Sequence, residues 1–121
     1  MARYVDGFVI AVPKKKLGTY LKMARLGAKV WKSHGALEYY ECVGEDLEAQ
    51  YGMMPFPKLA RLKKGETVVF SWIVYRSKKH RNSVNAKVMK DPRMNDPDFQ
   101  TDMPFEMKRM AFGGFKTLVY W

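Results

Sequence analysis

Residues 68–75 are apolar at both of their alternating sets of positions. Successive side chains of a strand point to opposite faces of the sheet, so each set belongs to one face. The two sets are Val68, Phe70, Trp72 and Val74, and then Val69, Ile73 and Tyr75. A sheet with one hydrated face would carry a polar residue at every second position. The pattern therefore predicts a sheet that is covered on both faces, by helices on one and by a partner subunit on the other.

Hydrophobic periodicity along the rest of the chain predicts six elements. The predicted strands are residues 4–12, 36–43, 66–76 and 108–120, and the predicted helices are residues 14–33 and 78–90. Ser77 stands where an N-cap of the second helix is expected. The connection formed by residues 44–65 is too long for a tight hairpin, and we expect a short helix in it at residues 45–51.

The order strand, helix, strand, strand, helix, strand is the ferredoxin-like βαββαβ arrangement, an α+β fold with an antiparallel sheet. Its first and third strands lie in the middle of the sheet, and these are the segments that are apolar on both faces here. The second strand is more polar, as suits an edge. We expect residues 1–121 to form a single domain. A bare apolar sheet face is a liability, so two sheets are predicted to pack face to face in a homodimer, a dimeric α/β barrel.

The first predicted helix carries three arcs of side chains. The expected core face is Leu17, Tyr20, Leu21, Ala24, Ala28 and Trp31. A smaller apolar arc, for which a monomer has no evident use, is Met23, Leu26 and Val30. In the second predicted helix the expected core residues are Val84 and Val88, backed by Met89.

Composition narrows the class of protein. An apolar content of 47% with 14% aromatic residues excludes a disordered chain. The single cysteine, Cys42, excludes an internal disulfide framework and fits a reducing compartment. No apolar run approaches ~20 residues, and residues 1–6 carry charge where a signal peptide needs an apolar core. We therefore predict a cytoplasmic protein without a membrane segment.

The net charge of +10, from 22 basic and 12 acidic residues, leaves two interpretations open. One is a solvated surface that keeps the protein soluble, and the other is a site for RNA or another polyanion. The third arc of the first helix is a basic stripe: Lys15, Lys22, Arg25, Lys29 and Lys32. A second basic run is Lys58, Arg61, Lys63 and Lys64. The strands lack the aromatic signature of RNA-binding modules that share this fold.

Few residues are candidates for chemistry. His34, His80 and Cys42 do not have the spacing of a metal site, so we expect no metal and no cofactor. Asp6 is unusual because it lies inside an apolar central strand, where a carboxylate must be paired or protonated. Arg76 or Arg109, each at a strand end, is its expected partner. Alternatively, Asp6 is an acid or base that lines a cavity between sheet and helices.

Several stretches resemble one family from end to end. They are YVDGFVIAVP (residues 4–13), GAL (35–37), EC (41–42), VVFSWI (68–73), DPRM (91–94), MPF (103–105), KRM (108–110) and GGF (113–115). The chain is similar to the YbaA-type family, small uncharacterised bacterial proteins with a domain of unknown function. Residues 45–64 fit it least well. The resemblance implies a ferredoxin-like fold of the dimeric α/β-barrel superfamily and implies no reaction. A haem-handling branch of that superfamily takes an iron ligand from the second helix, where His80 lies.

The function best supported by the sequence is a cytoplasmic dimeric α/β barrel with a small-molecule pocket between sheet and helices. If the protein is an enzyme, the pocket candidates are Asp6 as acid or base, Arg76 as anion clamp, Trp72 as a wall and His80 as a second proton carrier. Trp72 qualifies only if it shares a sheet face with Asp6. The alternatives are a basic RNA- or polyanion-binding module that uses the helix stripe, and a structural or stress-related interaction protein without a pocket.

Overall fold

A computed structural model describes residues 3–95, 97 and 102–121. The described strands are β1 (Tyr4–Pro13), β2 (Glu38–Val43), β3 (Glu66–Tyr75) and β4 (Ala111–Lys116). The helices are α1 (Leu17–Ser33), α2 (Phe56–Leu59) and α3 (Lys78–Met89), with 3-10 turns η1 (Lys14–Lys16), η2 (Pro92–Asn95) and η3 (Met107–Arg109). Apart from α2, which lies in the long connection, strands and helices follow the predicted order.

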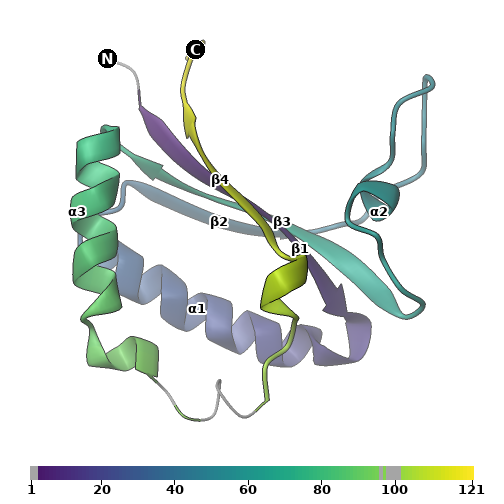
Figure 1. Ribbon diagram of the computed structural model, residues 1–121, viewed down its shortest axis with the longest axis horizontal. Helices are drawn as coiled ribbons and strands as arrows, with labels where there is room; N and C mark the ends of the chain where they lie inside the picture. The colour runs from purple at the N-terminus through teal and green to yellow at the C-terminus, as the bar shows by residue number, and fades with distance from the viewer. Residues whose placement is uncertain (1–2, 96, 98–101) are drawn as a thin grey trace.

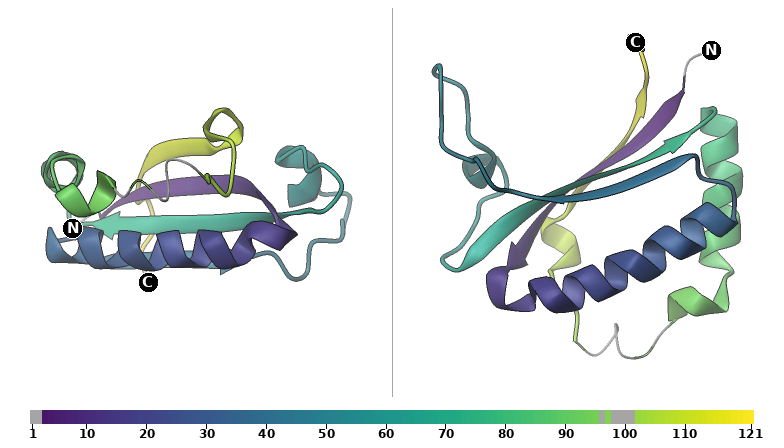
Figure 2. Two further views of the ribbon diagram at one scale, coloured as in Figure 1. Left: turned by 90° about the horizontal axis from the view of Figure 1, so that it is seen from below. Right: turned by 180° about the vertical axis from the view of Figure 1, so that it is seen from behind.

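The strands form one antiparallel sheet in the order β2-β3-β1-β4. β1 and β3 are central and β2 is an edge strand, as predicted, so the fold is ferredoxin-like. Figure 1 shows the sheet nearly edge-on, with β4 in front, and α1 and α3 together on one side of it. From below, α1 runs in front of the strands and along them (Figure 2). We call the covered side the helix face and the other side the open face.

Strand register assigns each residue to a face. Asp6 is opposite Ile73 on β3, and Gly7 is opposite Trp72. Residues opposite each other in a sheet point the same way. Asp6 and Ile73 therefore share the helix face, where buried side chains form two clusters. One cluster is Ile10, Val12, Tyr20, Ala24 and Val69, and the other is Val30, Ile73, Tyr75, Val84 and Val88.

The open face is apolar across its middle, and no long helix of the described residues covers it (Figure 2). It presents Val5, Val9, Tyr40, Phe70, Trp72 and Phe115. Phe70 is 44% exposed although it lies in a central strand. Its ring contacts Trp72 and Phe56 of α2, which lies near one end of this face. The double-sided apolar pattern of β3 thus leaves aromatic surface in solvent on one side of the single chain.

Several element boundaries differ from those predicted. Residues 14–16 form a 3-10 turn, β2 begins at Glu38, and β4 spans only Ala111–Lys116 because Met107–Arg109 form a turn before it. Residues 45–51 are not helical, since nearly all are exposed and no apolar face would be buried by a helix there. The N-cap prediction is confirmed, because the Ser77 hydroxyl accepts a hydrogen bond from the His80 amide at 3.0 Å.

The sequence predicted only some of the buried side chains of α1 and α3 correctly. Val84 and Val88 are buried as expected, but Met89 is 69% exposed. On α1, Tyr20 and Ala24 are buried, whereas Leu21 is 47% exposed. Val30, assigned to the smaller apolar arc, is fully buried. The reason is that α3 packs beside α1, so the side of α1 that carries Val30 also has a partner.

Candidate functional site

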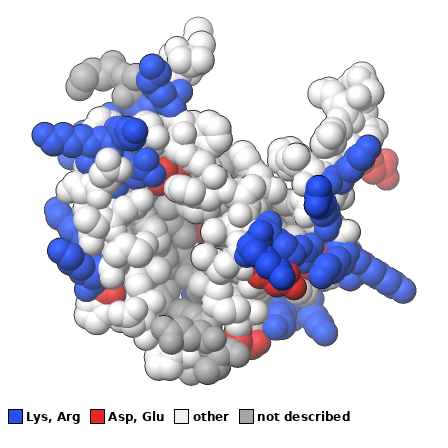
Figure 3. All heavy atoms as spheres, viewed as in Figure 1, with Lys and Arg blue, Asp and Glu red and all other residues white. Residues whose placement is uncertain are grey.

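A cavity of about 410 Å³ lies on the helix face, between α1, the sheet, the end of α3 and the turns η2 and η3. Figure 3 shows a hollow on this side of the molecule, between two groups of Lys and Arg. Its wall is mostly apolar, and thioethers are prominent among the lining groups. The lining methionines are Met23, Met89, Met94, Met107 and Met110. A concave apolar cavity with a few polar groups is the usual form of a small-molecule site.

Asp6 is one polar group of this cavity and is only 1% exposed. One carboxylate oxygen accepts a hydrogen bond from Arg81 Nη1 at 3.2 Å, and the other lies 3.5 Å from Asn85 Nδ2. Burial raises the pKa of Asp6, while the Arg81 charge and the Asn85 amide oppose that rise. The sequence-based expectation that Arg76 or Arg109 pairs with Asp6 is wrong.

The true partner of Asp6 comes from α3, because Arg81 of that helix reaches the first residues of β1. Arg81 also lies over the Tyr4 ring, with 4.9 Å from its guanidinium carbon to the ring centroid. The Asn85 carbonyl oxygen accepts bonds from Trp31 Nε1 at 3.1 Å and from the Tyr75 hydroxyl at 3.2 Å. One turn of α3 thus fixes Asp6 and ties it to α1 and β3.

Glu41 is the second carboxylate of the cavity, and two phenols hold it. The Tyr20 hydroxyl donates to Oε1 at 2.7 Å, and the Tyr39 hydroxyl donates to Oε2 at 2.8 Å. Burial, followed by the charge of Glu41, raises the pKa of both tyrosines, so both remain protonated donors. Sequence reasoning missed this group. The available signal was the alternation of β2, which places residues 39 and 41 on one face.

Gly27 allows Tyr39 to reach α1. A Cβ atom at this position would lie 2.8 Å from the Tyr39 hydroxyl oxygen, closer than such contacts occur. The absence of a side chain therefore lets the phenol pass close to the helix backbone and meet Glu41. The Trp31 and Tyr39 rings stand beside this crossing, 6.2 Å apart between centroids.

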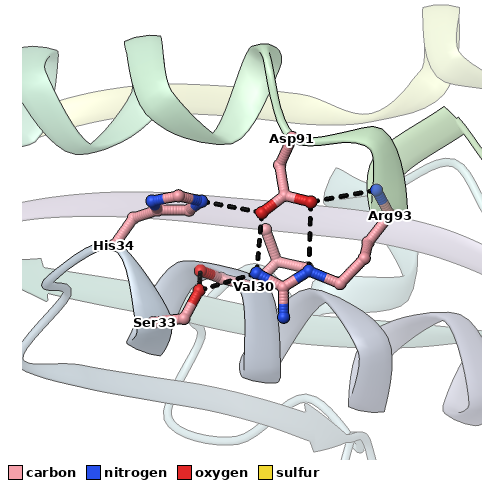
Figure 4. A network of polar contacts seen from close by, with 5 residues as sticks. All are labelled: Val30, Ser33, His34, Asp91 and Arg93. Atoms are coloured by element: carbon pink, nitrogen blue, oxygen red, sulfur yellow. Dashed lines mark hydrogen bonds and ion pairs between the residues drawn. The ribbon is translucent and has the colours of Figure 1, made fainter.

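A polar network at the ends of α1 and α3 holds the wall that carries Met94 (Figure 4). Asp91 accepts hydrogen bonds from His34 Nε2 at 2.8 Å and from Arg93 Nη2 at 2.6 Å. Arg93 also donates to the Ser33 hydroxyl at 2.9 Å. The Arg93 hydrogen bonds, and then that from His34, hold the pKa of Asp91 below its ordinary value. This network ties η2 to the end of α1.

Comparison with known proteins identifies the family. The family described as "Protein of unknown function (DUF1428)" matches residues 3–107. The chain is 43% identical over 117 residues to the uncharacterized protein YbaA of Escherichia coli strain K12, with 97% of each chain covered. The same values hold for YbaA of Shigella flexneri. The chain belongs to the DUF1428 family. The resemblance to YbaA-type proteins is thus confirmed.

Solved structures confirm the fold of this DUF1428 chain. A dimeric ferredoxin-like protein from an uncultured marine organism superposes with a TM-score of 0.67 at 10% identity, over 100% of both chains. A NIPSNAP family protein of unknown function from Agrobacterium tumefaciens strain C58 superposes with a TM-score of 0.58 at 17% identity, over 95% of this chain and 87% of that one. At such identities the likeness concerns the fold alone.

The structure does not bring the four predicted pocket residues of this DUF1428 chain together. Asp6 lines the cavity, but Trp72 lies on the open face, where its ring stacks on Tyr40 at 4.8 Å between centroids. Arg76 is exposed just beyond β3. His80 Nδ1 accepts a hydrogen bond from the Arg76 amide at 2.9 Å, away from the cavity lining. Burial, and then the charges of Arg76 and Lys87, lower the pKa of His80.

Three further observations concern the basic stripe, metal ligands and membrane spans. All five residues of the basic stripe (Lys15, Lys22, Arg25, Lys29 and Lys32) are exposed. The described residues contain no group of three or more His, Cys, Asp or Glu side chains placed to hold a metal ion. In the same part of the chain, no helix is long and apolar enough to cross a membrane.

Proposed function

We propose that this protein binds a small, largely apolar molecule in the cavity between sheet and helices and acts in the cytoplasm as a homodimer. The observation that carries the binding proposal is the cavity of about 410 Å³ with the buried Asp6 and the phenol-bound Glu41 in its wall. Volumes of ~300–1,000 Å³ are usual for ligand sites. Methionine side chains adapt their shape, so the wall suits an apolar guest. The exposed thiol of Cys42 fits a reducing compartment.

The homodimer proposal rests on the open face. Tyr40, Phe70 and Phe115 are each exposed on it beside Trp72, and patches of this kind mark interaction sites. A second copy is the occupant that we propose, since two equal apolar faces are complementary to each other in a two-fold arrangement. A structural relative of this fold bears the description dimeric.

A polyanion site is not our proposal, although the basic stripe is accessible. Single-strand binding also needs exposed aromatic rings beside the charges. Among the described residues, the exposed aromatic side chains lie on the strands, in the long connection and near the carboxyl end, and none lies on α1. Basic side chains in that arrangement suit a solvated helix surface.

Binding is tested by titrating the wild-type protein and two variants with the uncharged fluorophore N-phenylnaphthylamine. Ala24→Phe places a ring in the cavity, because Ala24 is buried and lines it. Ala86→Phe is the matched control, since Ala86 is an exposed residue of α3 outside the cavity lining. We expect Ala24→Phe to weaken probe binding by about tenfold or more, and Ala86→Phe to leave it unchanged. Equal binding by all three proteins would place the probe elsewhere and refute the cavity as the site.

A thermal melt of each variant accompanies the titration, since an added ring in a packed region often destabilises. If Ala24→Phe unfolds, Gly27→Ala offers a second perturbation of the same wall, with Gly18→Ala as its control on the same helix. If the wild-type protein binds no apolar probe, charged or uncharged, the proposal is refuted without the use of variants.

A further inference from the structure

The charges in the wall of the cavity have one sign. Its lining contains Asp6 and Glu41, and no Lys, Arg or His is among the described residues that line it. Asp6 is neutralised by the Arg81 guanidinium at 3.2 Å. Glu41 receives hydrogen bonds from two uncharged phenols, and no ion pair to it is found among the described residues. A negative centre thus remains in a protein whose net charge is +10.

Glu41 retains the capacity to accept further bonds. A carboxylate has about four acceptor positions on its two oxygens. The phenols of Tyr20 and Tyr39 occupy one position on each oxygen. The charge of Glu41 in turn contributes to the raised pKa of both tyrosines, so the phenols keep their protons and Glu41 stays the acceptor.

The surroundings of Glu41 suit a positive charge. The rings of Tyr20, Tyr39 and Trp31 line the same cavity, and the faces of aromatic rings attract ammonium groups. The rest of the wall is mostly apolar and suits an apolar body, and its other polar residues, Ser71 and Asn85, carry no charge to balance an anion. A carboxylate or phosphate on the ligand would meet Glu41 without a compensating cation in the lining.

We propose that the ligand is an organic cation, an apolar body that carries a protonated amine, with the ammonium group against Glu41 and the body against the methionine wall. This inference rests on the proposed function, because it names the class of molecule for the same cavity. It places a cation-selective cavity inside a protein whose net charge is +10.

The test uses three probes with one naphthyl body: naphthylethylamine, which is cationic at pH 7, uncharged naphthylethanol, and anionic naphthylacetate. Calorimetric titration compares their affinities for the wild-type protein and for Glu41→Gln, which keeps the shape of the side chain and removes its charge. Glu45→Gln is the matched control, since Glu45 is exposed and outside the cavity lining. We expect the wild-type protein to bind the amine about tenfold more tightly than the alcohol, as for one charged hydrogen bond, and the acid most weakly.

In Glu41→Gln the preference of amine over alcohol should vanish, with alcohol affinity within about twofold of wild type, and Glu45→Gln should behave as wild type. Equal binding of all three probes by the wild-type protein overturns the cation inference and leaves the binding proposal standing. Failure of N-phenylnaphthylamine and of all three naphthyl probes refutes the binding proposal itself. An acid that binds as tightly as the amine, or an amine preference that survives in Glu41→Gln, also overturns the inference. The wild-type comparison decides by itself if Glu41→Gln does not fold.

Discussion

The two faces of one sheet differ in what interrupts their apolar surface. On the helix face, apolar residues alternate in space with Asp6, Tyr39 and Glu41, and each of these polar groups has a specific partner. On the open face, the middle is aromatic and aliphatic, with Phe70 and Trp72 in contact and partly solvated. Polar groups with defined partners inside an apolar wall are typical of a site for a small molecule. An uninterrupted apolar surface is typical of a protein interface.

The largest effect is expected from the buried ion pair of the helix face. Asp6→Asn leaves the Arg81 guanidinium, whose side chain is 16% exposed, without its counter-charge. We expect a loss of about 3 kcal/mol in the free energy of unfolding, measured by urea denaturation. Asp46→Asn, an exposed residue in the long connection, should change it little. Adding Arg81→Met to Asp6→Asn should recover much of the loss, and a full loss in the double variant would contradict this account.

A charge placed on the open face tests whether that face is the dimer interface. Phe70→Glu would bury an unpaired carboxylate between two sheets, so the proposed homodimer should weaken by about 100-fold. Sedimentation velocity should then show a 14.1 kDa monomer, whereas the wild-type protein is expected to sediment as a dimer. Leu21→Glu is the matched control, since Leu21 is 47% exposed against 44% for Phe70 but lies on α1. A wild-type protein that stays monomeric at micromolar concentration would falsify the proposed interface.

Gly27→Ala tests whether the crossing of α1 and β2 sets the geometry at Glu41. The added methyl group meets the Tyr39 hydroxyl at 2.8 Å, so the phenol must move. We expect stability to fall by about 1 kcal/mol and the naphthylethylamine preference to weaken. Gly18→Ala on the same helix has open space and should gain about 0.5–1 kcal/mol from helix propensity. The double variant Gly27→Ala with Tyr39→Phe should relieve the clash, and no relief would point to another cause.

The smallest effect concerns the rim of the sheet, where Arg109 Nη1 and Nη2 each lie 2.7 Å from a Glu66 oxygen. The hydrogen bonds from Arg109 lower the pKa of Glu66 from 4.5 to about 2. A carboxyl group whose pKa is lower in the folded than in the unfolded state stabilises the protein when the pH is above the unfolded-state pKa. For Glu66 this contribution is lost as the pH falls from 4.5 toward 2. Melting temperatures between pH 7 and pH 3 should therefore decline less in Glu66→Gln than in wild type. Equal declines in the melting temperatures of Glu66→Gln and wild type would argue against the Glu66–Arg109 pair as the source of the pH dependence.

The sequence predicts the fold well because the decisive signals are local. Alternation in residues 68–75, the helical spacing around Tyr20 and Ala24, and the Ser77 cap each depend on a few neighbouring residues. The order of these elements then selects the topology. The short helix predicted at residues 45–51 is absent because a helix there would have no apolar surface to pack against.

The site was less predictable because it depends on register and on helix docking. A shift of one residue in strand pairing exchanges the faces, and this decides that Ile73 rather than Trp72 accompanies Asp6. The position of α3 makes Arg81, and not Arg76, the partner of Asp6. The phenols that bind Glu41 come from Tyr20 of α1 and Tyr39 of β2. Only Tyr39 and Glu41, two residues apart on one strand, are recognisable as a pair in the sequence.

The thioether wall has a chemical consequence of its own. Peroxide converts a methionine to its sulfoxide, which replaces a soft apolar contact by a strong dipole. Met89 and Met107 line the cavity and are 69% and 61% exposed, so dissolved oxidants can reach them. Oxidative stress would therefore make the apolar lining polar and hydrated. A reductase that removes the added oxygen would restore the apolar lining.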